Sequence, residues 1–224
     1  MISFFSRYKV FGIVFLMLSI IIIFLFYNAL KQKEKLPIIN PNGVDSSLVD
    51  SSIQHKKKYH KIANFKLVNQ NGDTITQEDY KDKIYVADFF FTTCQGICPI
   101  MTKNMGDVQK LILNDPEVKL LSHTVTPEID SVAQLYKYAT EKGVIGSKWN
   151  LVTGDKKQIY ELARKSYMAV QDDGDGGPYD MIHTENFMLV DKEKRVRGYY
   201  DGTKEEEIKK LLKDIKILKE SYVD

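Results

Sequence analysis

The stretch Ile84–Pro99, IYVADFFFTTCQGICP, decides the fold of this chain. Its first part, Ile84–Phe91, is mostly apolar and rich in residues that favour strands, with Asp88 inside it. Such a run is typical of a strand buried on both faces of a sheet. Two cysteines follow, Cys94 and Cys98, and the proline that ends the stretch suits the first turn of a helix. The sequence therefore predicts a core strand, a cysteine-bearing junction and a core helix.

Strands and helices alternate after this junction. The patterns predict further strands at 118–125, 149–153, 186–190 and 195–200, and helices over 101–112, 132–142, 159–163 and 208–218. Before it, Asn71-Gly72 lies between two β-type runs and predicts a hairpin with a two-residue turn. This order predicts an α/β fold with helices flanking a mixed sheet. A cysteine pair where the first core strand meets the first core helix is typical of the thioredoxin-like fold.

The N-terminal region contains an apolar run that could cross a membrane. Val10–Leu30 holds 21 residues without a charge, and as a helix it would be about 31 Å long, the thickness of a bilayer core. A cleaved signal peptide is the alternative, but its apolar part is shorter and ends at a small-residue site. No cysteine follows the run, which argues against a lipoprotein anchor. We therefore expect an uncleaved single-pass helix.

The flanking charges give no clear orientation, because Arg7 and Lys9 before the run are matched by three lysines after it. A short N-terminal flank and a large C-terminal domain are typical of exported anchored proteins. We expect a protein of the cell inner membrane with its soluble domain on the periplasmic side.

Three regions are expected: an anchor at 1–30, a tether at 31–60 and a thioredoxin-like domain at 61–224. The tether is predicted from its turn-forming residues, which include Pro37, Pro41 and several serines. Beyond residue 30 the chain has 30 basic and 30 acidic residues. This balance gives no electrostatic case for binding nucleic acid. The sequence carries no signal of oligomeric state.

The two cysteines are the only ones in the chain, which argues against a disulfide scaffold and for redox or metal chemistry. Backbone N–H groups at a helix N-terminus favour the thiolate, the form that attacks disulfides and binds soft metals. Dithiol exchange and metal binding both remain open at this point. Three residues separate Cys94 from Cys98, and this longer spacing leaves room for an ion between the sulfurs.

A metal needs at least one more donor, and the chain has four histidines. We expect His55 and His60 to be solvated in or beside the tether. We expect His123 to bond a backbone carbonyl after its strand. His183 follows a polar, glycine-rich loop and precedes a strand, so the loop could carry it over the cysteines. Spacing alone leaves open whether His183 is a ligand.

Two thiolates and one imidazole suit Cu(I), which prefers soft donors and accepts low coordination, and an added ligand would allow Cu(II). A structural zinc site would require a fourth ligand, and none is evident. Met101 and Met105 are soft donors close in sequence, but their helical period predicts core packing.

Three motifs together resemble the Sco (SenC-type) copper chaperones. They are Asp88-Phe-Phe-Phe-Thr-Thr-Cys94 with Cys98-Pro99, then Thr124-Val-x-Pro-Glu-x-Asp130, then His183-Thr184 before a strand. The resemblance covers about residues 36–219. It implies copper held by the two cysteines and His183. It further implies delivery of copper to the binuclear copper centre of cytochrome c oxidase, whose copper-site subunit would be the partner, or reduction of that centre's cysteines.

Two positions depart from the usual family pattern: Gln95 stands where many members have Pro, and Thr126 where many have Asp. Neither removes a ligand, but both bear on loop stiffness and thiol pKa, so they affect the redox behaviour more than copper binding. The alternative function is that of an enzyme, a membrane-anchored thiol–disulfide oxidoreductase using Cys94 and Cys98. A peroxidase-like relative would need a single cysteine, so the pair followed by His183 argues against it.

Overall fold

Strand β3 (Ile84–Phe90) lies in the middle of the sheet, and all seven of its residues are buried. It pairs in parallel with β4 (Val118–Thr124) and antiparallel with β6 (Asn186–Val190). The computed structural model describes residues 8–30, 34–44, 49–56, 58–170, 182 and 184–223. It divides into two compact units, Met1–Glu34 and Lys35–Asp224, which are described separately below.

The first unit contains α2 (Lys9–Leu30), whose large apolar side chains from Val10 to Tyr27 are all exposed. Within the described residues, it is the one helix long and apolar enough to cross a membrane by length and composition. This agrees with the predicted anchor.

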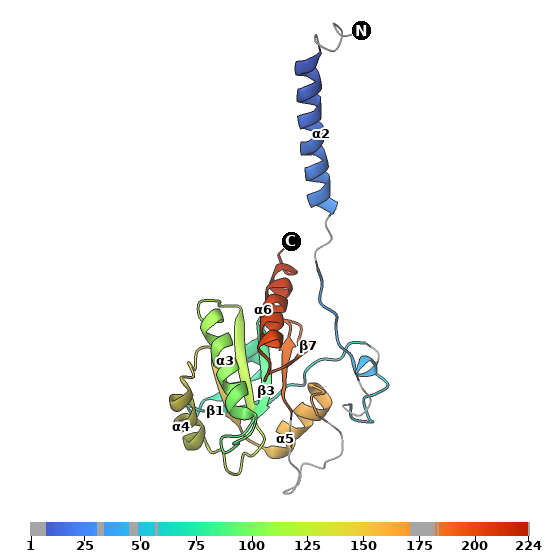
Figure 1. Ribbon diagram of the computed structural model, residues 1–224. Helices are drawn as coiled ribbons and strands as arrows, with labels where there is room; N and C mark the ends of the chain where they lie inside the picture. The colour runs from blue at the N-terminus through green and yellow to red at the C-terminus, as the bar shows by residue number, and fades with distance from the viewer. Residues whose placement is uncertain are drawn as a thin grey trace. The chain divides into compact units, whose positions relative to one another are not determined.

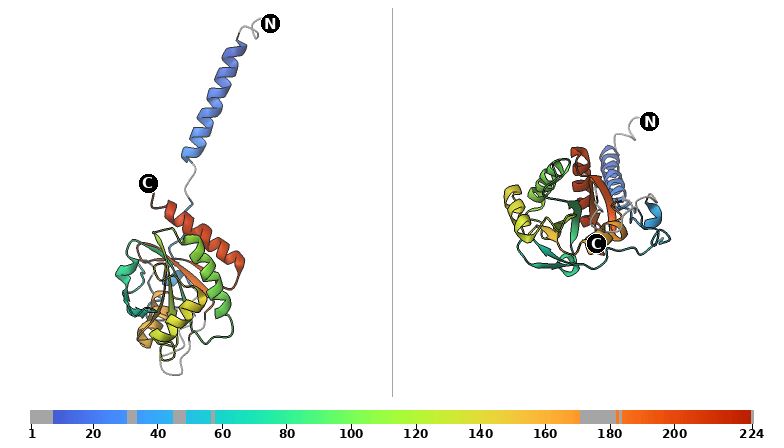
Figure 2. Two further views of the ribbon diagram at one scale, coloured as in Figure 1. Left: turned by 90° about the vertical axis from the view of Figure 1, so that its left-hand side faces the viewer. Right: turned by 90° about the horizontal axis from the view of Figure 1, so that it is seen from below.

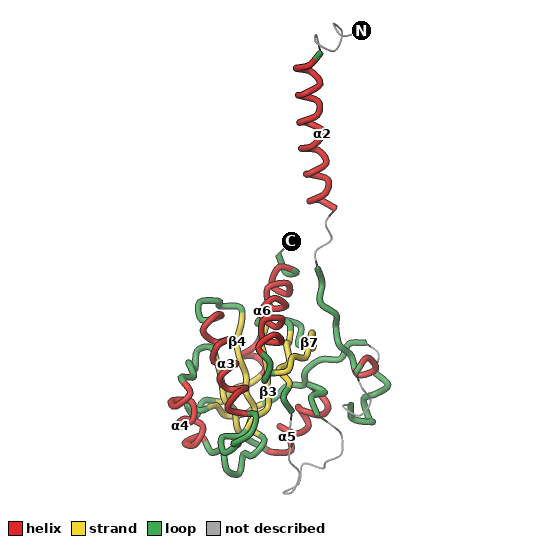
Figure 3. The backbone as a smooth tube through the Cα atoms, viewed as in Figure 1, coloured by secondary structure: helices red, strands yellow, loops and turns green. Residues whose placement is uncertain are grey.

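The second unit is built on a seven-stranded sheet in the order β2-β1-β5-β4-β3-β6-β7 (Figures 1 and 3). The remaining strands are β1 (Lys66–Asn69), β2 (Thr74–Thr76), β5 (Trp149–Thr153) and β7 (Val196–Asp201). Because β3, β4 and β5 are parallel and the outer pairs are antiparallel, the sheet is mixed, as predicted.

Helices cover both faces of this sheet. One face packs against α3 (Cys98–Ile112), α4 (Val132–Lys142) and α6 (Glu205–Glu220), which lie together in Figure 2, left. The other face packs against α5 (Lys156–Glu161), the π-helix η4 (Leu162–Ser166) that continues it, and the described residues 49–56 and 58–65. A short 3₁₀ turn, η3 (Gln77–Tyr80), links β2 to β3, and η1 (Pro41–Gly43) lies near the start of the unit.

Local sequence accounts for the helix ends around the cysteine junction. Helix α3 begins at Cys98 with proline in its first turn, as predicted. The Ser131 hydroxyl caps α4 by accepting a hydrogen bond from the Gln134 N–H. Gly143 ends α4 with φ near +67°, a conformation that glycine adopts without steric cost.

The hairpin between β1 and β2 differs from the predicted two-residue turn. β1 ends at Asn69 and β2 begins at Thr74, so four residues lie between the strands. The Asn69 side chain stabilises the wider turn by accepting hydrogen bonds from the N–H groups of Asn71 and Asp73, both at 2.9 Å. The Asx interaction thus overrides the Asn71-Gly72 signal.

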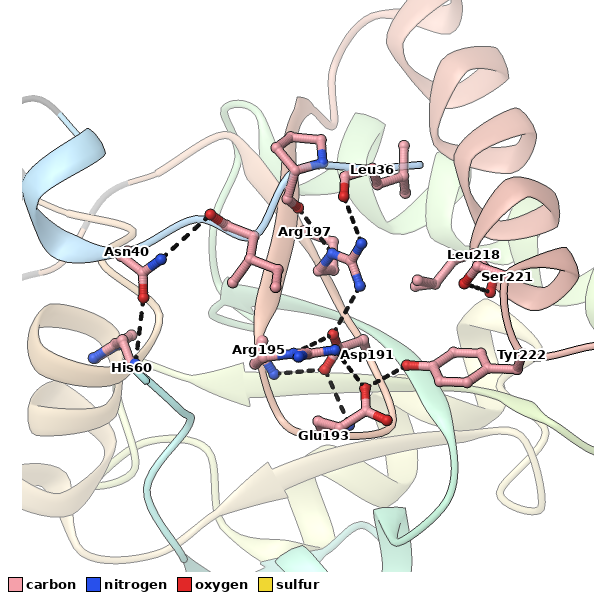
Figure 4. A network of polar contacts seen from close by, with 12 residues as sticks. Leu36, Asn40, His60, Asp191, Glu193, Arg195, Arg197, Leu218, Ser221 and Tyr222 are labelled. Carbon is pink, nitrogen blue, oxygen red and sulfur yellow. Dashed lines mark hydrogen bonds and ion pairs between the residues drawn. The ribbon is translucent and has the colours of Figure 1, made fainter. Parts of the chain in front are cut away.

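Residues expected in the tether pack against the domain from Lys35 onward. Val49 is fully buried and Ile53 is 8% exposed. The Ile39 N–H bonds the Val196 carbonyl at 2.9 Å, and the Arg197 guanidinium binds two carbonyls of residues 36 and 37 (Figure 4). The turn-forming residues correctly predicted that this segment lacks long helices and strands. They did not predict that part of the segment is buried against the domain. We call the described residues 35–44, 49–56 and 58–62 the N-terminal strap.

Candidate metal centre

The cysteine pair lies where β3 ends and α3 begins. The β3–β4 register carries Phe90 opposite Thr124, so the loops after both strands meet at one edge of the sheet. The Cys94 N–H bonds the Phe91 carbonyl at 3.3 Å, which turns the chain immediately after β3. Cys94 is half-buried, whereas Cys98 is 5% exposed in the first turn of α3.

The two thiols influence each other, and their pKa values differ. Burial raises the pKa of Cys94, but the neighbouring Cys98 thiol and the N–H groups of Gly96, Ile97 and Cys98 favour its thiolate, and the net pKa falls below the usual thiol value. Burial, together with the neighbouring Cys94 sulfur, raises the pKa of Cys98 to about 12. The half-buried Cys94 therefore ionises more readily than the buried Cys98.

A buried carboxyl group lies close to this pair. Asp88 in β3 is 2% exposed and accepts a hydrogen bond from the Ser122 hydroxyl, which itself accepts one from the Trp149 ring N–H at 2.8 Å. Burial raises the pKa of Asp88 to about 7, and its charge in turn raises the pKa of Cys98. The sequence pattern places Asp88 inside an apolar strand but predicts no role for it. A charged residue inside an otherwise apolar core strand was the available signal.

The predicted third ligand, His183, lies outside the described residues. Its neighbours Ile182 and Thr184 are described, and both are buried. They precede β6, which runs antiparallel to β3, so the start of β6 lies at the sheet edge where the cysteine loop begins. Among the described residues, no group of three or more His, Cys, Asp and Glu side chains could hold a metal ion.

The other histidines have different environments. His55 is exposed, as expected. His60 was expected to be solvated, but it is 5% exposed and its Nε2 lies 2.8 Å from the Ser166 carbonyl, because the strap packs on the domain. Burial lowers the pKa of His60.

His123 is fully buried on the sheet face opposite Asp88, and its ring stacks on Phe89 with centroids 5.0 Å apart. The expected bond to a carbonyl is wrong, because neither ring nitrogen has a hydrogen-bond partner among the described residues. Burial lowers the pKa of His123 to about 4. The nearby backbone of Asp88 raises this pKa only slightly, because it forms no hydrogen bond with the ring. Met101 and Met105 pack in the core, as predicted.

Comparison of the sequence with known protein families identifies the family of this chain. The sequence model of the SCO1/SenC family matches residues 53–220. The chain belongs to the SCO1/SenC family. This confirms the resemblance inferred from the cysteine, Thr124–Asp130 and His183 motifs.

Individual relatives agree with the assignment. The SCO1 protein homolog of Bacillus subtilis is 33% identical over 159 residues, which cover 70% of this chain and 82% of the relative. The solved structure of BsSco is 30% identical with a TM-score of 0.62, covering 74% of this chain and 95% of the other. It is described as having a disulfide switch and as a member of the Sco family of cytochrome c oxidase assembly proteins. The predicted fold, a thioredoxin-like mixed sheet with flanking helices, is thereby confirmed.

A copper-bound relative shares the fold. The structure of Bradyrhizobium japonicum ScoI with copper bound has a TM-score of 0.55 and 24% identity, covering 69% of this chain and 99% of that one. At this identity the comparison shows the fold alone.

Proposed function

We propose that this chain is a membrane-anchored copper chaperone that holds copper through Cys94, Cys98 and His183. The observation that carries the proposal is the placement of two free thiols together at the start of α3, where the pKa of Cys94 is lowered. Thiolate sulfur prefers soft ions such as Cu(I), and two neighbouring sulfurs can share one ion. Membership in the SCO1/SenC family, in which a structure is described with copper bound, supports copper as the cargo.

The assignment of His183 rests on sequence position and topology. The loop that contains it leads into β6, whose first residues lie at the cysteine edge of the sheet. An imidazole nitrogen would complete a three-coordinate site with the two sulfurs. The family motif His183-Thr184 supports this assignment.

The proposed partner is the copper-site subunit of cytochrome c oxidase, since a relative is described as a cytochrome c oxidase assembly protein. Copper would pass to the binuclear centre by exchange of ligands across a docked interface. The apolar helix α2 would anchor the protein in the inner membrane, with the domain on the periplasmic side.

Anaerobic titration of the full chain with Cu(I), in detergent, tests the ligand set. We expect the reduced protein to bind about one copper per chain, and Cys94→Ser, Cys98→Ser and His183→Ala each to lose affinity, by about tenfold or more for the histidine. The exposed His55 gives a matched control, and His55→Ala should bind as the wild type does. Unchanged binding by His183→Ala would remove that residue from the site. Unchanged binding by the cysteine variants would refute the copper site.

The pKa difference between the cysteines favours a second function, thiol–disulfide exchange. The Cys94 thiolate would attack one sulfur of a substrate disulfide and release the other as a thiolate. Cys98, after losing its proton, would attack the Cys94 sulfur, closing the internal disulfide and releasing the second substrate thiol. Reduction of a disulfide-bonded copper-site peptide by copper-free protein would support this function. Such activity lost in both cysteine variants and retained in His183→Ala would separate it from copper delivery.

A further inference from the structure

A buried carboxylate holds together the two loops at the cysteine edge of the sheet. Asp130 follows β4, is fully buried, and accepts hydrogen bonds from three threonines. Its Oδ1 accepts from the Thr92 hydroxyl at 2.5 Å. Its Oδ2 accepts from the Thr92 N–H at 3.2 Å, from the Thr126 hydroxyl at 3.1 Å and from the Thr124 hydroxyl.

Thr92 is the residue on which these contacts converge, and it lies two positions before Cys94. Asp130 holds both its backbone N–H and its side chain. The Gln134 side chain of α4 donates to the same hydroxyl at 3.0 Å. The backbone of Thr92 is thus fixed from two elements immediately before the turn in which the Cys94 N–H bonds the Phe91 carbonyl.

The loop that contains Asp130 is itself well ordered. The Asp130 N–H bonds the Thr126 carbonyl at 2.8 Å, and the next residue, Ser131, caps α4. A carboxylate removed from water is stable only where donors replace its hydration. Two of these donors are the N–H and the hydroxyl of Thr92, and both reach Asp130 only when the loop from Thr92 to Cys94 has the arrangement seen here. The burial of Asp130 therefore stabilises this arrangement of the loop.

We infer that Asp130 is a positioning residue for the cysteine site, acting through Thr92 to hold Cys94 in its place before the start of α3, next to Cys98. The inference extends the proposed copper function, because a sulfur held in place loses less conformational freedom on binding an ion. Asp130 touches neither the sulfurs nor the copper in this scheme.

Full-chain variants in detergent test the inference with two readouts. The first is the rate at which iodoacetamide alkylates Cys94 at pH 7 in the absence of copper. The second is Cu(I) affinity measured by competition with a Cu(I) chelator. For Asp130→Asn we expect alkylation of Cys94 to slow about threefold as its ordered N–H donors are lost. We expect Cu(I) affinity to fall about tenfold, the lower end of effects from residues that support metal ligands.

Four further variants separate positioning from stability. Thr92→Val should reproduce the effect of Asp130→Asn, whereas Thr92→Ser, which keeps the hydroxyl, should restore wild-type values. The double variant should be no worse than the more affected single variant, because both remove the same contact. Asp191→Asn provides the matched control: it alters another buried, hydrogen-bonded aspartate, lowers the unfolding midpoint, and should leave both readouts unchanged.

If Asp130→Asn and Thr92→Val both stay within about twofold of the wild type in alkylation and affinity, the positioning role is overturned. If Asp130→Asn does not fold, the comparison of Thr92→Val with Thr92→Ser tests the positioning role by the same twofold criterion. If the wild type binds no copper, the proposed function fails, while the alkylation series still tests the positioning of Cys94.

Discussion

The cysteine pair derives its chemistry from its position at the start of a helix, where one sulfur receives N–H donors and the other is buried. The pKa of Cys94 is lowered and that of Cys98 is raised to about 12, although the residues are chemically identical. We therefore expect iodoacetamide at pH 7 to label Cys94 well before Cys98 in the copper-free reduced protein. Peptide mass spectrometry after timed quenching measures both rates. Equal labelling of the two cysteines would show that the thiolate is shared between them.

Asp88 gives the fold a pH dependence that opposes the usual behaviour of carboxylates. Its pKa rises from 3.8 to about 7 on folding because burial disfavours the charge. The contribution to stability is therefore full below about pH 4 and is lost as the pH rises through 7. We expect Asp88→Asn to abolish a decline on the order of 3–4 kcal/mol in the free energy of unfolding between pH 4 and pH 8. Urea unfolding at several pH values measures the slopes, and parallel curves for the two proteins would contradict the assignment.

His123 makes the stability of the fold change with pH in the opposite direction to Asp88, over a similar pH range. Its pKa falls from 6.5 to about 4 on folding, so its contribution is full above about pH 6.5 and is lost as the pH falls toward 4. We expect His123→Leu to unfold less readily than the wild type at pH 4.5, with a smaller difference at pH 8, because the buried ring nitrogens have no hydrogen-bond partners among the described residues. Thermal unfolding at both pH values measures this. A variant destabilised equally at both would show that ring packing, and not protonation, dominates.

At the residue scale, the sequence is enough to propose the cysteines as the site but not to find the groups around them. Residue type and spacing are enough to select Cys94 and Cys98, because thiols are few and chemically distinctive. Asp88 and Asp130 could not be assigned roles in this way. Their importance depends on which side chains the β3–β4 register brings together, and this is a property of the folded sheet.

At the scale of elements, strand and helix positions followed the hydrophobic period closely wherever core burial determined it. The strand predicted at 149–153 is β5, and the helix predicted to end near Gly143 ends there. The prediction differed where a side chain bonds its own backbone, as Asn69 does in the first hairpin, and where irregular chain packs on the core, as the strap does. Neither the Asn69 turn nor the packing of the strap produces a repeating pattern of apolar residues, so the sequence pattern could not predict them.

The strap is held to the β6–β7 hairpin by a buried ion network (Figure 4). Asp191 is 1% exposed and binds both Arg195 at 2.7 Å and Arg197 at 2.9 Å. Arg197 also donates to the carbonyls of Leu36 at 2.5 Å and Pro37 at 2.8 Å. It is therefore the cation that joins the strap to the sheet edge.

We expect Arg197→Met to release the start of the strap and to lower the free energy of unfolding by about 3–5 kcal/mol, since it leaves Asp191 buried with one cation fewer. Hydrogen exchange should quicken at the Ile39 N–H, which bonds the Val196 carbonyl, before the rest of the sheet is affected. The exposed pair Lys103–Asp107 provides a control, and Lys103→Met should leave the stability nearly unchanged. Unchanged exchange at Ile39 would show that strap packing does not depend on this cation.

At the scale of the whole molecule, the sequence predicted the order of anchor, connecting segment and thioredoxin-like domain. It could not determine where the connecting segment ends. The strap contributes few apolar side chains, and they are separated by turn formers, so no window of sequence resembles a core element. In the folded domain, Val49 and Ile53 are nevertheless buried in the core shared with α5, and His60 is bonded to the Ser166 carbonyl.

This arrangement predicts different behaviour for two shortened chains. A chain beginning at Lys35 keeps the strap and should fold with the stability of the same unit in the full protein. A chain beginning at Lys61 loses the burial of Val49 and Ile53, worth about 1.5–3 kcal/mol for each side chain as an upper estimate. Its unfolding midpoint should fall by about 10 °C, because each kcal/mol shifts the midpoint of a domain of this size by roughly 2–4 °C. Calorimetry of the two chains measures the difference. Equal midpoints would mean that residues 35–60 act as a tether in solution, since a segment that contributes to the core cannot be removed without a loss of stability.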